Sequence, residues 1–260
     1  MTVAAVGIDA GSTTLKIAAI DATGALLWSR VEPASPRTAD QVVAMLAACA
    51  AEAGPWGEAP LVATGYGRDL VPGAVRRVTE ITCHARGAYA EAGCACTVLD
   101  LGGQDSKVLA IGDDGRVLDF AMNDRCAAGT GRFLEVAAAR LGLDLAGFDA
   151  AAARAAHEAV LSSTCTVFAE SEMVSLLARG TPVDEIAAGL HRAMARRVAA
   201  LARGVAIRDP VLASGGVALS GSVRRALAGE LGMPVGLPRH PQLLGAVGAA
   251  LVGLGHGARP

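Results

Sequence analysis

Two short segments carry the glycines and side chains that phosphate chemistry needs. Asp9-Ala-Gly-Ser-Thr-Thr14 follows one apolar stretch, and Asp100-Leu-Gly-Gly-Gln104 follows another. Glycine lets a phosphate approach the backbone, and a tight turn points its N–H groups toward an anion. A carboxylate at the end of each apolar stretch would repel phosphate, but it can hold Mg²⁺ through water. The two segments therefore predict a site for a polyphosphate and its metal ion.

These two segments belong to an internal repeat. Val6–Lys16 resembles Thr97–Lys107 under a fixed offset of 91 residues, which aligns Asp9 with Asp100. Each copy predicts a strand, a turn that contains glycine, a second strand and a polar hairpin turn. One copy alone would be explained by an ordinary hairpin. Two copies in register favour two similar lobes that face each other.

A third glycine segment, Ser214-Gly215-Gly216, follows a predicted strand and could approach the ribose or adenine of a nucleotide. In the first segment, hydroxyl donors surround the turn, and Lys16 either supplies positive charge or flanks the second strand. The candidate ligand-binding residues are turn glycines and their polar neighbours: Gly11, Ser12, Thr13, Thr14, Lys16, Gly102, Gly103, Gln104, Asp105, Gly215 and Gly216.

Hydrophobic periodicity predicts an α/β fold, with mixed sheets covered by helices. The expected helices have apolar residues at helical spacing: Ala39–Ala53, Thr130–Leu141, Val167–Ala178, Ile186–Ala206, Val223–Leu231 and Gly245–Leu254. Strands are expected at Lys16–Ile20, Lys107–Ile111, Val211–Ala213 and Pro234–Leu237, and loops at Gly57–Pro60 and Gly142–Gly147. The repeat places a boundary near residue 96.

Two of the six cysteines precede predicted helices. Cys126 and Cys165 are each expected just before or within the first helical turn, where unpaired N–H groups and the helix dipole favour an anion. That position suits a thiolate nucleophile or a metal ligand, although spacing alone explains packing equally well. The other four are expected to pack, with a metal role left open for the last two: Cys49, Cys83, Cys94 and Cys96.

The residues around Cys126 and Cys165 resemble the signature segments of one family. Asn-Asp-Arg-Cys-Ala-Ala-Gly-Thr-Gly-Arg-Phe (123–133) and Ser-Ser-Thr-Cys-Thr-Val-Phe-Ala-Glu-Ser-Glu (162–172) look like those of 2-hydroxyacyl-CoA dehydratase activators. These form a branch of the BadF/BadG/BcrA/BcrD ATPase family. Three more segments agree with the resemblance: Ala63–Arg68, Glu80–Ala88 and Gly189–Arg192. The glycine turns resemble those of the wider acetate kinase/sugar kinase/Hsp70/actin superfamily.

The resemblance implies two ribonuclease H-like lobes with ATP in the cleft between them. The N-terminal lobe would span 1–96 and include the C-terminal helix at about 243–260, and the C-terminal lobe, 97–242, would carry the cluster-ligand helices. A homodimer with one [4Fe-4S] cluster is also implied, ligated by Cys126 and Cys165 of each subunit. The stoichiometry is reasonable, because such a cluster needs four thiolates and two suitable cysteines per chain supply them only in a dimer.

The implied activity is ATP-driven electron transfer: a reduced ferredoxin or flavodoxin charges the cluster, and the dimer passes the electron to a dehydratase. Asp9 and Asp100 would organise Mg²⁺ through water, and Gln104 would orient the attacking water. Alternatively, Asp9 only stabilises its turn, and the Gln104 side chain only hydrogen-bonds its own loop. Gln242 resembles a nucleotide-side residue of the family. The stretch Leu219–Val223 lacks the Asn that members often carry, which leaves the base contacts open.

Composition limits the other possibilities. A net charge of −2 offers no basis for binding nucleic acid or an acidic membrane, and neither a targeting nor a membrane-spanning segment is expected, which favours a cytoplasmic protein. His191 lies among helical residues and is expected at a helix surface or in packing. Three alternatives stay open: an electron-donating ATPase for benzoyl-CoA reductase or a double-cubane cluster protein, a small-molecule kinase of the same superfamily, and a non-catalytic ATP-switched assembly protein.

Overall fold

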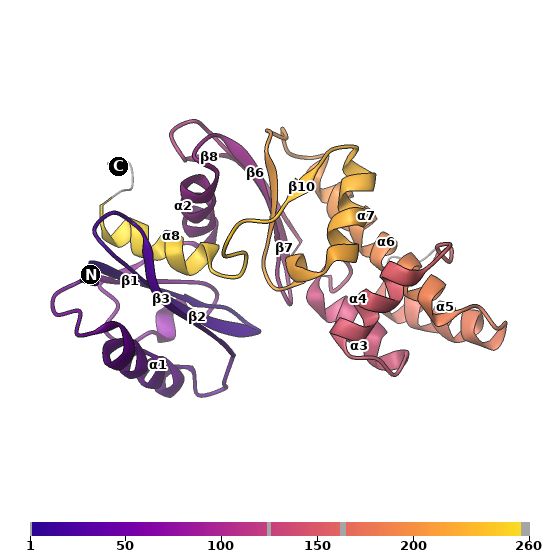
Figure 1. Ribbon diagram of the computed structural model, residues 1–260, viewed down its shortest axis with the longest axis horizontal. Helices are drawn as coiled ribbons and strands as arrows, with labels where there is room; N and C mark the ends of the chain where they lie inside the picture. The colour runs from indigo at the N-terminus through magenta and orange to yellow at the C-terminus, as the bar shows by residue number, and fades with distance from the viewer. Residues whose placement is uncertain (1, 124–125, 162–164, 256–260) are drawn as a thin grey trace. The chain divides into compact units, whose positions relative to one another are not determined.

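The computed structural model describes residues 2–123, 126–161 and 165–255 (Figure 1). The chain divides into two compact units. Unit 1 comprises Met1–Cys96, Ile111–Leu118 and Pro238–Pro260, and unit 2 comprises Thr97–Ala110 and Asp119–Leu237. Within the described part of the chain, no helix is both long enough and apolar enough to cross a membrane.

Unit 1 is built on a five-stranded mixed sheet in the order β3-β2-β1-β4-β5. Strand β1 pairs antiparallel with β2 and parallel with β4. The strands are β1 (Ala5–Ala10), β2 (Thr14–Ile20), β3 (Leu26–Pro33), β4 (Leu61–Thr64) and β5 (Arg76–Arg77). The helices of this unit are α1 (Thr38–Ala53), the 3-10 turn η1 (Arg68–Leu70), α2 (Glu80–Ala92) and α8 (Leu244–Gly253).

The second sheet repeats the order of the first. Its strands run β8-β7-β6-β9-β10, and β6 pairs parallel with β9 as β1 does with β4. The strands are β6 (Cys96–Leu101), β7 (Ser106–Ile111), β8 (Val117–Asn123), β9 (Val211–Ser214) and β10 (Val235–Gly236). The shared strand order confirms that the repeat in the sequence encodes one folding unit twice.

Five helices and one 3-10 turn lie together beside the second sheet (Figure 1). They are α3 (Gly131–Arg140), α4 (Leu145–Arg154), α5 (Thr166–Ala178), α6 (Val183–Ala202), η2 (Val217–Leu219) and α7 (Gly221–Leu231). Helix α6 contributes most to this core, because Ile186, Leu190, Met194 and Val198 recur at helical spacing and are fully buried.

Small residues allow very close packing in unit 1. Helix α8 lies on β1 and against α2, and Figure 1 shows α2 and α8 crossing. A Cβ added at Gly7 would lie 1.9 Å from the carbonyl oxygen of Ala246, and one at Gly248 would lie 1.7 Å from that of Cys83. The backbones therefore approach so closely that only glycine fits. This packing explains how a chain with 32 glycines and only 3% aromatic residues builds a dense core.

We expect Gly248→Ala to lower the free energy of unfolding by about 1–3 kcal/mol, because the new methyl group must displace backbone. The matched control is Gly229→Ala in α7, where nothing lies within 4 Å of the added Cβ. Alanine is the better helix former, so this control should be neutral or slightly stabilising. Chemical denaturation of both variants measures the difference. Equal destabilisation by the two changes would contradict this account of the packing.

The structure corrects several expected elements. The loop expected at Gly142–Gly147 is wrong in its second half, because α4 begins at Leu145 after Asp144, whose carboxylate accepts a hydrogen bond from the amide of Gly147 at 2.7 Å. The expected helices and late strands are present within a few residues of their predicted limits. Elements that the pattern did not predict include α2, α4, β4, β5 and the third strand of each repeat, β3 and β8.

His191 packs in the core of unit 2, which confirms the packing role and excludes the helix surface. Its side chain is 2% exposed, stacks on Phe148 with ring centroids 4.5 Å apart, and hydrogen-bonds the carbonyl oxygen of Ala187 at 2.7 Å. Burial lowers the pKa of His191, although Asp149 lies 3.9 Å away and opposes the shift. The ring is therefore held neutral.

A pH dependence of stability follows from this burial. The unfolded chain binds a proton at His191 near pH 6.5 and the folded protein does so only at lower pH, so stability is fully present above pH 6.5 and falls below it. We expect His191→Phe to flatten the decline in unfolding free energy between about pH 6.5 and 5. Chemical denaturation of both proteins at several pH values measures this decline. An unchanged slope in the variant would show that other groups cause the decline.

Candidate functional site

The turn between β1 and β2 in unit 1 has the form of an anion-binding nest. The amide of Gly11 donates to the carbonyl oxygen of Thr14 at 3.1 Å and closes the turn. Ser12 and Thr13 are exposed, and their amides donate to no partner among the described residues. Two free amides and two hydroxyls are therefore presented at the end of a buried strand.

Unit 2 repeats this turn between β6 and β7. The amide of Gly102 donates to the carbonyl oxygen of Asp105 at 2.9 Å, the same bond at the same repeat position. Gly103 and Gln104 form the tip, and the Gln104 side chain is exposed with no hydrogen-bond partner in the described part of the chain.

Each turn is accompanied by a buried carboxylate paired with a lysine. In unit 1, Lys16 Nζ lies 3.0 Å from Oδ2 of Asp9, whose side chain is 5% exposed. In unit 2, Lys107 lies 3.5 Å from Asp100 and 2.7 Å from Asp105, and its own side chain is 2% exposed. Such burial is tolerated because the opposite charges offset one another. The repeat therefore conserves an Asp–Lys pair as well as a turn.

The third glycine segment also has a counterpart in unit 1. Gly215 follows β9 with φ +86°, and a Cβ there would lie 2.2 Å from the carbonyl oxygen of Leu101. Gly65 follows β4 with φ +88°, and a Cβ there would lie 2.6 Å from both the carbonyl oxygen of Ala10 and Oδ1 of Asp9. Both positions need glycine, since a side chain at positive φ is strained. Of these two glycines only Gly215 was expected to approach a ligand; Gly65 lies in Ala63–Arg68, a segment noted for its resemblance to the family.

Polar contacts fix the second carboxylate. The hydroxyl of Ser214, at the end of β9, donates to Oδ1 of Asp100 at 2.9 Å, and both side chains are buried. Gly216 follows and is the N-cap of η2. In the stretch Leu219–Val223, Ser220 caps α7 by accepting the amide of Val223 at 3.1 Å.

The start of α8 completes the surroundings of Asp9. A Cβ at Gly245 would lie 2.9 Å from Cε1 of His84 and 3.0 Å from Oδ2 of Asp9. The Nδ1 atom of His84 hydrogen-bonds the carbonyl oxygen of Glu80 at 2.9 Å. Gln242 is half-buried in the turn before α8. The sequence patterns did not identify His84 or Gly245 as neighbours of Asp9. Helix α2, which carries His84, was not predicted, and the helix predicted at Gly245–Leu254 did not reveal which element it packs against.

The two candidate ligand cysteines both belong to unit 2. Cys165 is the N-cap of α5 and is exposed, as predicted from the sequence. Cys126 is half-buried and lies before the helix, not within its first turn: α3 begins at Gly131 and Thr130 is its N-cap. The intervening Gly129 has φ +87°, which an α-helix cannot accommodate. The helix dipole therefore acts directly on Cys165 only.

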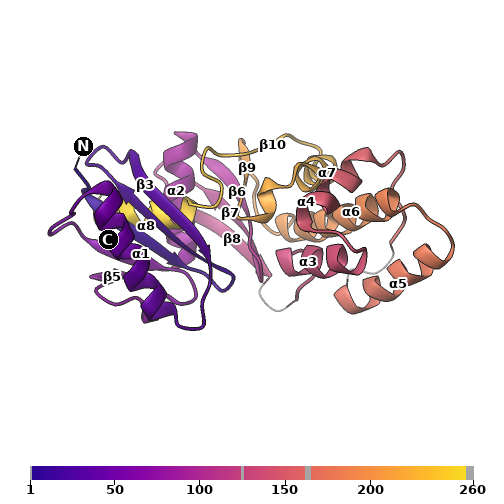
Figure 2. The same cartoon turned by 60° about the horizontal axis from the view of Figure 1, so that its bottom comes forward.

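Helix α5 packs against α3, and Figure 2 shows the two helices side by side. Arg140 of α3 lies 3.2 Å from Glu170 of α5. The signature segment at 162–172 includes residues 162–164, which lie outside the described residues.

Three of the other four cysteines differ from Cys126 and Cys165 in being buried. Burial raises the pKa of Cys49 and of Cys96 to about 11 and that of Cys83 to about 12. Thiols with such pKa values are poor metal ligands and nucleophiles at neutral pH. Cys94 is exposed and hydrogen-bonds the carbonyl oxygen of Ala92 at 3.6 Å. Packing is therefore confirmed for the three buried cysteines.

A metal site of three or more His, Cys, Asp or Glu side chains is absent from the residues that the structure describes. Cys126 and Cys165 are the two thiols of unit 2 that are not fully buried, so one chain offers half of the four thiolates that a [4Fe-4S] cluster needs. The residues present fit such a cluster only when a second copy supplies the other half.

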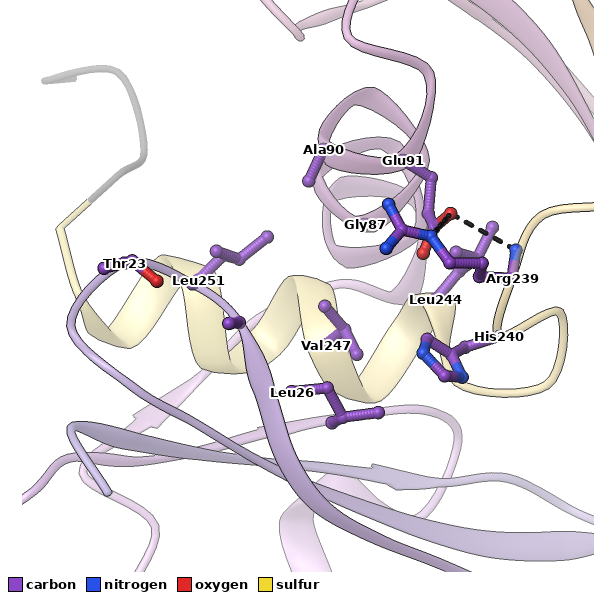
Figure 3. Close-up of a pocket in the computed structure, with 12 residues that line it drawn as sticks. Thr23, Leu26, Gly87, Ala90, Glu91, Arg239, His240, Leu244, Val247 and Leu251 are labelled. Atoms are coloured by element: carbon purple, nitrogen blue, oxygen red, sulfur yellow. Dashed lines mark hydrogen bonds and ion pairs between the residues drawn. The ribbon is translucent and has the colours of Figure 1, made fainter. Parts of the chain in front are cut away.

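A pocket of about 450 Å³ lies elsewhere, beside α2 and α8 (Figure 3). At one end the amide of Arg239 donates to Glu91 at 3.2 Å. The lining contains none of the candidate ligand residues, so this pocket is not the phosphate site. The lining residues come from the turn after β2, from α2 and from α8 with the segment before it: Thr23, Gly24, Ala25, Leu26, Gly87, Ala90, Glu91, Arg239, His240, Leu244, Val247 and Leu251.

The repeated sheet, the paired glycine turns and the buried carboxylates define the actin and sugar kinase-like class of nucleotide-binding folds. The sequence profile of the BadF/BadG/BcrA/BcrD ATPase family matches residues 6–253. The chain therefore belongs to that ATPase family.

Three similar proteins illustrate the relationship. The 2-hydroxyisocaproyl-CoA dehydratase activator of Clostridioides difficile is 43% identical over 191 residues, 74% of this chain and 72% of the relative. A solved structure of such an activator from Clostridium difficile with bound ADPNP has a TM-score of 0.89 and 36% identity, over 96% of this chain and 94% of that one. Component A of the Acidaminococcus fermentans (R)-2-hydroxyglutaryl-CoA dehydratase has a TM-score of 0.91 and 37% identity, over 98% and 99%.

Proposed function

We propose that this protein is an ATP-dependent one-electron donor that activates a 2-hydroxyacyl-CoA dehydratase. The observation that carries the proposal is the combination, in one chain, of two phosphate turns with two accessible cysteines in the signature segments. The similarity to dehydratase activators extends over nearly the whole chain, so it includes both features.

The nucleotide would bind through the backbone. In each turn the closing hydrogen bond fixes the loop, and the next two amides are left to donate to phosphate oxygens. Asp9 and Asp100 would hold Mg²⁺ through water, since each is kept in place by a lysine and, for Asp100, by Ser214. Gln104, exposed at the tip of its turn, would orient the water that attacks the γ-phosphate.

The cluster would be held by Cys126 and Cys165 of two copies of the chain, which makes the active form a homodimer. When bound, the [4Fe-4S] cluster supplies a site that accepts one electron from a ferredoxin or flavodoxin and donates it at low potential. Cys165 presents its thiol at the N-terminus of α5, where the helix dipole stabilises negative charge. Cys126 is held by a hydrogen-bonded loop next to the second phosphate turn.

The experiment combines anaerobically purified protein, MgATP, a low-potential reductant and a purified 2-hydroxyacyl-CoA dehydratase with its substrate. We expect dehydration only when ATP and this protein are both present, and no dehydration with ADP. Phosphorylation of a sugar by a protein that lacks iron would support the kinase alternative instead. Electron delivery to a benzoyl-CoA reductase or a double-cubane cluster protein, with none to the dehydratase, would show that the electron acceptor belongs to that related class instead.

A further inference from the structure

We infer that nucleotide bound at the second phosphate turn controls the reactivity of the Cys126 thiol through hydrogen bonds inside unit 2, with Ser106 and Asn123 as the positioning residues. The inference rests on the proposed function for one point, that nucleotide binds this turn. It needs no movement of one unit against the other. It therefore adds a specific route of control to the proposed site.

The first step joins the turn to α3. The carbonyl oxygens of Gly102 and Gly103 accept the amides of Gly131 and Arg132, at 2.9 and 2.8 Å. A trans peptide points its N–H and C=O in opposite directions, so the amides of the same peptide groups, on Gly103 and Gln104, point away from α3. The two peptide groups would thus donate through their N–H groups to a phosphate on one side, and accept through their carbonyl oxygens from the first turn of α3 on the other.

The contact between turn and helix is close. A Cβ at Gly131 would lie 3.1 Å from Cα of Gly103 and 3.1 Å from Cγ2 of Val217. A shift of the turn on phosphate binding must therefore move the start of α3 with it. Charge-assisted bonds to phosphate also polarise the shared peptide groups and strengthen their bonds to α3. Nucleotides that differ by a γ-phosphate should differ in both effects.

The second step joins β7 to the cysteine loop. Ser106, 1% exposed at the start of β7, donates to the carbonyl oxygen of Gly129 at 2.6 Å. Thr130, the N-cap of α3, donates through its hydroxyl to the carbonyl oxygen of Ala127 at 2.7 Å. The backbone between Cys126 and α3 is thus hydrogen-bonded to two elements. One is β7, the strand that follows the phosphate turn, and the other is the N-cap of α3.

The third step reaches Cys126 itself. The side-chain amide of Asn123 donates to the carbonyl oxygens of Cys126, at 3.0 Å, and Ala128, at 2.8 Å. Asn123 is the last residue of β8. Its amide therefore clamps the loop at the cysteine and two residues beyond it. Cys126, which lies outside any helix, depends on this clamp for its position.

The test uses the full chain freed of iron, so it does not depend on cluster chemistry. The rate of alkylation of Cys126 by iodoacetamide is measured by peptide mass spectrometry with MgADP and with the magnesium complex of a non-hydrolysable ATP analogue. We expect rates that differ by about threefold or more in the wild-type protein, as charge-assisted bonds at the turn would require. Cys94, an exposed thiol of unit 1, serves as the internal control and should react equally in both states.

Substitutions then test the route. Ser106→Ala and Asn123→Ala should each bring the ratio of the two Cys126 rates close to one, whereas Ser106→Thr keeps the hydroxyl and should retain the ratio. Ser29→Ala, at an exposed position of β3, is the matched control and should leave the ratio unchanged. Thermal melting and binding of a fluorescent nucleotide confirm that each variant folds and binds.

Equal Cys126 rates in wild-type protein that binds both nucleotides would overturn the inference, and so would a ratio that survives in both Ser106→Ala and Asn123→Ala. Neither result would affect the proposed electron transfer, which is measured separately with the cluster in place. A loss of nucleotide binding by the wild-type chain would overturn both. Conversely, a clear ratio in a protein that never holds iron would support the route and contradict the proposed function.

Discussion

Replacing Cys126 by Ser should abolish both the [4Fe-4S] cluster and ATP-dependent electron delivery. A serine hydroxyl stays protonated at neutral pH and is a poor ligand for the iron of a cluster, and the change removes one ligand from each chain of a dimer. The loop should keep its shape, because Asn123 bonds the backbone of residue 126 rather than its side chain. We expect iron content below about a tenth of the wild-type value and electron transfer below detection.

The matched control for this change is Cys94→Ser. Cys94 is exposed like Cys165, but it belongs to unit 1 and makes a weak hydrogen bond to the carbonyl oxygen of Ala92. The control should retain iron, colour and electron transfer, and both variants should bind nucleotide normally. Cys126→Ser protein that keeps its cluster would contradict the ligand assignment.

Replacing Asp100 by Asn should reduce ATP hydrolysis by about 10²-fold, the size of effect expected when a preorganised electrostatic group is lost. Asn keeps the shape of the side chain but removes the negative charge that would hold Mg²⁺. The fold should survive, because Lys107 remains paired with Asp105 at 2.7 Å and Ser214 can still bond the amide oxygen. Steady-state hydrolysis over a range of Mg²⁺ concentrations measures the effect.

The control is Asp114→Asn in the turn after β7, where the carboxylate is 59% exposed and pairs with Arg116 in its own turn. Such surface pairs contribute little to stability, so hydrolysis and melting temperature should both stay near wild type. Hydrolysis by the Asp100→Asn protein within about twofold of wild type would show that Asp100 has only a structural role.

The parts of the site that recur could be predicted from the sequence. A fixed offset and apolar strands before each Asp identify both turns, and the structure repeats the closing hydrogen bond in each copy. The repeat did not predict that Lys16 pairs with Asp9 or that Lys107 pairs with Asp100. Spacing along a strand does not tell whether a lysine turns toward a ligand or toward its neighbouring carboxylate.

Other features could not be predicted from the sequence because tertiary contacts determine them. Strands β3 and β8 lie at sheet edges and are partly exposed, so they lack a continuous apolar run. Gly65 is required by its approach to Ala10, a contact across 55 positions of sequence that no local pattern reveals. Gly129, between Cys126 and the N-cap of α3, has a positive φ, which the apolar spacing of Thr130–Leu141 could not indicate.

Native mass spectrometry of the anaerobically isolated protein tests the central claim most directly. The account predicts a species with the mass of two chains plus one cluster of four irons and four sulfides, which Cys126→Ser protein does not form. A wild-type protein that carries no iron, or a single chain that holds a complete cluster by itself, would contradict it.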